Sequence, residues 1–162
     1  MCNSLIGTCL DLAASPATLM IGMGNMDRSD DGAGLKIAEK LKARFPERAF
    51  LESEKSVEGL VFDFIENPAF DTILFIDAVN FGEEPGTVRL FTAEDIPKFQ
   101  PAVSTHKVPM SLLMDLIVQK NKKPLLLGIQ PGSVKLMGEM SEAVKELLSD
   151  FEFFLSRKQG TG

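Results

Sequence analysis

LMIGMGNMDRSDDGAGL, residues 19–35, contains the pattern from which the folding of this chain is best predicted. Its first five residues are mostly apolar and predict a strand, which the nearby glycines bring to a tight turn. Two adjacent acids, Asp30 and Asp31, then stand at the start of a segment whose apolar residues recur at helical spacing up to about Phe45. In open α/β sheets the carboxyl end of such a strand and the amino end of such a helix open into one crevice, where these folds place their sites. We therefore expect the functional residues to gather at this crevice.

Strands and helices are expected to alternate along the rest of the chain. The continuous apolar runs at residues 72–76 and 124–129 are typical of strands buried on both faces of a parallel sheet. The expected strands lie at residues 19–23, 49–52, 72–76, 88–91 and 124–129, and the expected helices at residues 31–45, 57–65, 110–118 and 140–155. This alternation predicts an α/β protein, a three-layer α/β/α sandwich of the phosphorylase/hydrolase-like kind with a mostly parallel twisted sheet.

The size and composition of the chain indicate one globular domain. With 162 residues, 44% of them hydrophobic, the chain is long enough to bury one core. Residues 1–17 show no clean period and are expected to form a loosely attached extension, so that residues 18–162 make up a single domain. A net charge of −6 without a basic stripe argues against nucleic-acid binding.

The cellular setting predicted from the sequence is the cytoplasm. The two cysteines, Cys2 and Cys9, form neither a disulfide framework nor a metal motif, so we expect free thiols in a reducing compartment. The N-terminus lacks the basic region of a signal peptide, and no apolar run is long enough for a membrane span. We therefore expect no direct insertion into a membrane.

The glycines of the opening stretch also invite a dinucleotide-binding interpretation. After Gly22 and Gly24, however, the third position of a G-x-G-x-x-G motif is Asp27, whose negative charge would face the pyrophosphate. Glu52, at the end of the second expected strand, could imitate the acid that binds ribose. We rank this interpretation below the others.

At three places along the chain, polar residues stand in loops where α/β sheets usually have catalytic or binding groups. Asp30 and Asp31 begin a helix; one acid there caps free amides and interacts with the helix dipole, which leaves its neighbour to face the crevice. Asp77 follows a buried strand directly, although it could simply hold its own loop. His106 is the only histidine and lies in a polar loop. Two carboxylates with one imidazole suit a divalent ion such as zinc or nickel, provided that they converge.

At these residues the chain resembles the nickel-iron hydrogenase maturation endopeptidases. The matching signatures are IGMGNMDRSDDGAG (residues 21–34), FIDAVNFGEEPG (75–86), STHKVPMSLL (104–113) and LGIQPGSV (127–134), in the order and spacing of the family. The last two are most similar to the branch that processes hydrogenase-3-type large subunits. In one departure, ESEKS at residues 52–56 replaces the Asp-Gly-Gly of many members; in another, Asp31 is Asp where other branches carry Glu.

The resemblance implies an aspartic-type endopeptidase that removes a short C-terminal extension from the hydrogenase large-subunit precursor. It also implies that Asp31, Asp77 and His106 are both the catalytic and the metal-contacting residues. Nickel is expected to arrive with the precursor, with zinc or cadmium able to substitute in the site, and the protein is expected to act as a monomer. A non-cleaving chaperone that checks the precursor for nickel would use the same three residues, so this alternative stays open.

Overall fold

The computed structural model describes residues 2–96, 100–101 and 108–158. Its elements are α1 (Cys2–Ala14), β1 (Thr18–Gly22), the 3-10 helix η1 (Ser29–Gly32), α2 (Ala33–Arg44), β2 (Ala49–Leu51), α3 (Val57–Phe64), β3 (Thr72–Asn80), β4 (Val88–Phe91), β5 (Gln100–Pro101), α4 (Met110–Gln119), β6 (Lys123–Ile129) and α5 (Glu142–Arg157). The sheet has the order β2-β1-β3-β6-β4, with β5 paired to β3 outside this row. The first four strands of the row are mutually parallel, and β4 is an antiparallel edge strand, as expected for residues 88–91.

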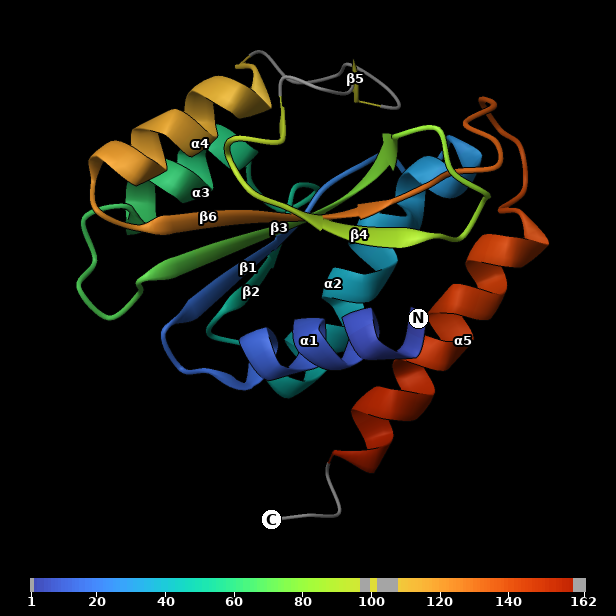
Figure 1. Ribbon diagram of the computed structural model, residues 1–162, viewed down its shortest axis with the longest axis horizontal. Helices are drawn as coiled ribbons and strands as arrows, with labels where there is room; N and C mark the ends of the chain where they lie inside the picture. The colour runs from blue at the N-terminus through green and yellow to red at the C-terminus, as the bar shows by residue number, and fades with distance from the viewer. Residues whose placement is uncertain (1, 97–99, 102–107, 159–162) are drawn as a thin grey trace.

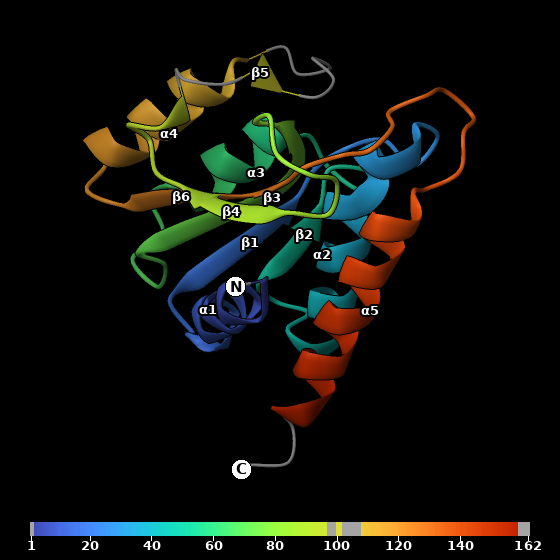
Figure 2. The same ribbon diagram turned by 45° about the vertical axis from the view of Figure 1, so that its right-hand side comes forward.

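Helices cover both faces of the sheet (Figure 1), which confirms the predicted three-layer α/β/α sandwich. Successive residues of a strand point to opposite faces, and the core divides accordingly. Met20 and Leu74 pack with α1, α2 and α5 in one cluster, whereas Leu19 and Ile73 pack with α3 and α4 in the other. A second view shows the same separation of the two helical layers (Figure 2).

The expectation of a loosely attached N-terminal extension is wrong. Residues 2–14 form helix α1, and its apolar face, which includes Ile6, Leu10 and Ala13, is buried against the sheet and α5. These residues recur at spacings of three and four, a helical period that the surrounding small and polar residues obscured. Cys9 belongs to the same buried face and is a free cysteine. The division of the chain at residues 17 and 18 stays a prediction.

Two element boundaries near the crevice differ from the expected ones. Strand β3 does not stop at Asp77 but continues to Asn80, and Asp77 pairs in register with Gly128 of β6. The expected helix from Asp31 begins instead as the 3-10 turn η1, and regular α2 starts at Ala33. Both differences arise because tertiary contacts at the sheet end, rather than local propensity, fix these residues.

Glycine at two positions allows α2 to lie close to the sheet. A Cβ atom on Gly34 would come within 2.2 Å of the Ile76 carbonyl oxygen, and one on Gly22 would come within 2.2 Å of the Ala38 Cβ. No side chain fits in either space. The start of α2 is therefore held against β3 at Ile76, the residue before Asp77.

Candidate functional site

The loop after β1 is held by two carboxylates that bind consecutive backbone amides. Gly24 N donates to Glu52 Oε2 at 2.9 Å, and Asn25 N donates to Asp31 Oδ2 at 2.9 Å. Gly24 has φ +128°, and a Cβ there would lie 1.9 Å from the Asp31 carbonyl oxygen, so the turn requires glycine. Glu52 was considered from the sequence as a ribose ligand. In the structure its carboxylate stabilises the loop after β1.

The segments that contain Asp31 and Asp77 meet at one end of the sheet. Asp31 is in η1, which contacts β3, and the helix that follows packs Gly34 onto the carbonyl of Ile76, the residue before Asp77. On the other side, Met23 N donates to Ile76 O at 2.8 Å and connects the β1 loop to the same point. Both carboxyl groups belong to buried residues. The bond from Asn25 fixes the orientation of the Asp31 carboxylate.

The Asp30 carboxylate binds a distant part of the chain. The N-cap residues of η1 and α2, Arg28 and Gly32, make no side-chain cap bond. The fully buried Asp30 instead accepts hydrogen bonds from Gly132 N (2.7 Å), Ser133 N (3.0 Å), Ser141 N (2.7 Å) and Ser141 Oγ (2.8 Å). This carboxylate ties η1 to the loop between β6 and α5 and to the start of α5. The Asp31 carboxylate, by contrast, accepts from Asn25 N in the loop after β1.

Gln130 is a buried polar residue of this region that sequence reasoning missed. Its Oε1 accepts from Phe81 N at 2.8 Å and from Glu83 N at 3.3 Å, and its Nε2 donates to Asn80 Oδ1 at 3.2 Å. Gln130 therefore shapes the loop that follows β3. A polar residue directly after a buried apolar strand is the same signal that identified Asp77, so the sequence contained the information needed to find it.

The third predicted site residue, His106, lies outside the described residues, so its position relative to the two acids stays a prediction. In the part of the chain that the structure describes, no three His, Cys, Asp or Glu side chains are grouped so as to hold a metal ion. Two of the three predicted ligands, Asp31 and Asp77, belong to that part. The arrangement seen is thus two buried acids at the end of the sheet where α/β folds place their sites.

The loop at residues 52–56, where the sequence departs from the family pattern, is exposed over most of its length and locally stabilised. Ser56 caps α3 by accepting a hydrogen bond from Gly59 N at 3.1 Å. Lys42 Nζ pairs with Glu54 at 2.5 Å, and this partner is the main reason that the pKa of the Glu54 carboxyl is lowered. These structural contacts explain the polar and charged residues of the loop, so no catalytic role is needed to explain them.

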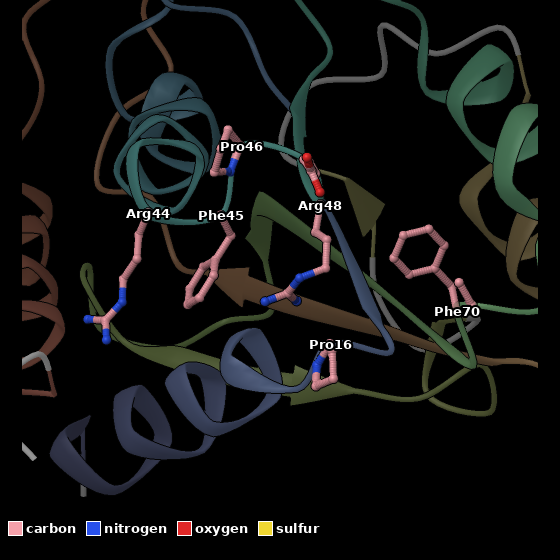
Figure 3. A pocket seen from close by; sticks show the side chains of 8 residues that line it. Pro16, Arg44, Phe45, Pro46, Arg48 and Phe70 are labelled. Carbon is pink, nitrogen blue, oxygen red and sulfur yellow. The ribbon is translucent and has the colours of Figure 1, made fainter. Parts of the chain in front are cut away.

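A hollow of about 490 Å³ lies at the opposite end of the sheet, where the chain enters β1, β2 and β3 (Figure 3). Its cations are already used in structural contacts: Arg48 Nη1 donates to Ser15 O at 2.6 Å and to Thr18 O at 3.0 Å, and its guanidinium lies 4.6 Å from the centre of the Phe45 ring. Burial lowers the pKa of Arg48. Arg44 donates in turn to Leu155 O at 2.8 Å. We assign this hollow to packing, since both cations bind backbone carbonyls.

Among the helices that the structure describes, none is both long enough and apolar enough to cross a membrane.

Comparison with known proteins gives a consistent result. The family model described as hydrogenase maturation protease (HycI) matches residues 35–153, more than half of the chain; the match includes Asp77 and begins after Asp31. The hydrogenase 3 maturation protease of Escherichia coli (strain K12) is 26% identical over 144 residues, 89% of this chain and 92% of that protein. The hydrogenase expression/formation protein HupM of Azotobacter chroococcum is 29% identical over 143 residues, 83% of this chain and 68% of that protein. The crystal structure of a NiFe hydrogenase maturation protease, HycI from Thermococcus kodakarensis, matches at a TM-score of 0.70 and 28% identity, covering 93% of this chain and 97% of that one.

Proposed function

The chain belongs to the hydrogenase maturation protease family, and from this premise we propose that it removes the C-terminal extension of the large-subunit precursor of a nickel-iron hydrogenase. It is an endopeptidase, a hydrolase whose product is the matured hydrogenase subunit. The family match carries this proposal, and the pair of buried acids at the carboxyl end of the sheet supports it.

We propose that Asp31, Asp77 and His106 form an incomplete coordination site for nickel that the precursor carries as part of the substrate. The support is that Asp31 and Asp77 come from different elements and lie at one end of the sheet, each on a backbone fixed by close packing. Two carboxylates and an imidazole suit a divalent ion that keeps other ligands. Such a site has few ligands of its own, so it binds strongly only when the precursor supplies the ion and the rest of its coordination.

The chemistry required is hydrolysis of one peptide bond. A water oxygen adds to the scissile carbonyl carbon, the C–N bond breaks, and the water protons pass to the new carboxyl group and to the departing amine. A buried carboxylate beside the bond can accept a proton from the attacking water. Nickel would position the peptide and polarise its carbonyl. We propose Asp31 or Asp77 for the proton transfer, which makes the enzyme an aspartic-type peptidase in the broad sense.

We propose that the substrate is a hydrogenase-3-type large subunit. Support comes from the 26% identity to the Escherichia coli hydrogenase 3 maturation protease. A match to the crystal structure named Hydrogenase 3 Maturation protease, with a TM-score of 0.68, adds to it. We also propose that the reaction occurs in the cytoplasm and that the protein acts as a monomer.

The test is nickel-dependent shortening of the cognate precursor, followed by mass spectrometry. The wild-type protein should remove the extension from nickel-loaded precursor and leave metal-free precursor intact, with zinc-loaded and cadmium-loaded precursor as further arms. Asp77→Asn, nearly identical in shape, should lower the cleavage rate at least about 100-fold. Asp150→Asn, on an exposed part of α5, is the matched control and should cleave normally. Full activity of Asp77→Asn would remove Asp77 from the site.

The two alternatives considered from sequence are less well supported. A chaperone that never cleaves would leave the precursor mass unchanged, and the match to a family of proteases argues against it. A dinucleotide site would need Glu52 for ribose, but that carboxylate binds the Gly24 amide of its own loop.

A further inference from the structure

Two loops beside the proposed site are joined into one unit. The loop after β1 and the loop between β6 and α5 are connected by Met137 N donating to Asp27 O at 2.6 Å and by Ser29 Oγ donating to Lys135 O at 2.8 Å. The four hydrogen bonds that Asp30 accepts, from Gly132, Ser133 and Ser141, connect η1, at the end of the first loop, to the second loop. Both views show these segments side by side, in blue and orange (Figures 1 and 2). A partner would therefore meet a preformed surface.

This joined unit exposes three large apolar side chains, which we call the apolar shelf: Met26, Leu136 and Met137. Their exposed fractions are 43%, 58% and 80%. A single exposed apolar residue is ordinary, but apolar side chains presented together on connected loops indicate an interaction surface. Methionine is especially suited to such a surface because its flexible thioether adapts to different partners.

The apolar shelf is continuous with the proposed site. The Met26 sulfur would lie 2.9 Å from a Cβ built on Gly32, the residue directly after Asp31. A molecule that covers Met26 therefore reaches the segment that carries the proposed ligand. A second copy of this chain seated here would obstruct the site, whereas a substrate has to pass over this surface to be cleaved.

The backbone of the apolar shelf is held in conformations that these residues rarely adopt. Met137 has φ 59° and Ser29 has φ 50°, and each makes one of the bonds between the loops. Non-glycine residues persist in this region only where the surroundings enforce it, and such residues cluster at ligand-binding sites. Here the enforced turn at Met137 leaves its side chain almost fully exposed.

The loop after β1 also contains a donor that lacks an acceptor. Within the described part of the chain, Arg28 Nε is a buried side-chain nitrogen without a hydrogen-bond partner. A buried donor in this state is costly unless something supplies an acceptor. This nitrogen is buried, so the exposed apolar side chains, and not Arg28, form the surface that a partner would contact.

We propose that the apolar shelf binds an apolar segment of the large-subunit precursor next to the bond that is cut. This inference rests on the proposed function, since it names the surface through which the same site receives its substrate. The polar groups beside the shelf, Asp27 and Lys135, form the kind of rim that surrounds an apolar contact.

The test uses the full chain with two shelf substitutions, Leu136→Gln and Met137→Asn, combined in one variant. Asparagine tolerates positive φ, so the turn should survive while the apolar surface is lost. Phe62→Ser on α3, which removes an equally exposed apolar side chain away from the two loops, is the matched control. Equal melting temperatures of the three proteins establish that all are folded.

Two measurements are made: the Kd for immobilised metal-free precursor, and the KM and kcat for cleavage of nickel-loaded precursor. The shelf variant should weaken binding and raise KM about tenfold or more, with kcat nearly unchanged, whereas Phe62→Ser should behave as wild type.

The outcomes separate this inference from the proposed function. If the shelf variant binds and cleaves as wild type does, the inference is overturned and the protease function stands. If wild type binds the precursor without shortening it and the shelf variant loses that binding, the shelf is supported and the proposed reaction fails. If wild type neither binds nor shortens the precursor, both fail.

Discussion

At the scale of single residues, Asp30 is the clearest case of a carboxylate that serves structure. Its two oxygens accept four hydrogen bonds from Gly132, Ser133 and Ser141. In Asp30→Asn, an NH2 group replaces one carboxylate oxygen and cannot accept a hydrogen bond. Some of the buried N–H groups that donate to Asp30 would then lack an acceptor. We expect a loss of about 2–3 kcal/mol in the free energy of unfolding, measured by urea denaturation. The exposed Asp150→Asn should stay within about 0.5 kcal/mol of wild type; an equal effect of the two would contradict this role.

Cys9 gives a second prediction at this scale, one that depends on pH. Burial raises the pKa of its thiol to about 12, while an unfolded cysteine ionises near pH 8.5. Between these values only the unfolded chain releases the proton, so stability is complete below about pH 8.5 and falls as the pH rises. At pH 9.5 the loss should be about 1.4 kcal/mol relative to neutral pH.

Urea denaturation at pH 7.5 and pH 9.5 measures this loss, with Cys9→Ala as the control. The control keeps Cys2, so any contribution of that thiol is common to both proteins. Cys9→Ala should lack the extra alkaline loss, even though its stability at neutral pH differs. Identical pH dependence of the two proteins would show that the Cys9 thiol ionises equally in the folded and unfolded states.

At the scale of elements, two glycines in helices predict opposite effects of the same substitution. In α1, a Cβ on Gly7 would meet nothing within 4 Å, so Gly7→Ala should stabilise the protein by about 0.5–1 kcal/mol through the helix. In α2, a Cβ on Gly34 would lie 2.2 Å from the Ile76 carbonyl oxygen, so Gly34→Ala should cost about 2 kcal/mol or more. Thermal unfolding followed by circular dichroism measures both, and a stable Gly34→Ala protein would show that α2 can move away from β3.

The elements were also where the sequence predicted most. Buried strands such as β3 and β6 have continuous apolar runs, so their presence and parallel pairing could be read from the sequence. Helix α1 was missed because its buried face includes small residues such as Ala13, which weaken the apolar period that identifies an amphipathic helix. The extension of β3 through Asp77 to Asn80 was missed because it depends on pairing with β6 and β5, which no local pattern contains.

At the scale of the whole molecule, the site could be predicted only as far as topology determines it. Parallel strands end at one edge of a sheet, so Asp31 and Asp77 were expected together, and the structure brings their segments together. The local pattern alone did not distinguish the two adjacent acids, and Asp31 was named only through the family resemblance. The reason is that the hydrogen bonds of Asp30 run to residues more than 100 positions away. His106 stays a prediction.

Helix α1 contributes to the stability of the whole molecule, although the sequence predicted a loosely attached segment there. Helix α1 buries Ile6, Leu10 and Ala13 against the sheet and α5, so it is part of the main core. Deleting residues 1–15 should therefore expose apolar surface on β1 and α5 and cost more than about 4 kcal/mol, because each large buried apolar side chain contributes about 1.5–3 kcal/mol. The milder Leu10→Ala should cost about 2–5 kcal/mol. Urea denaturation measures both, and a truncated protein as stable as the full chain would restore the view of residues 1–17 as a loosely attached extension.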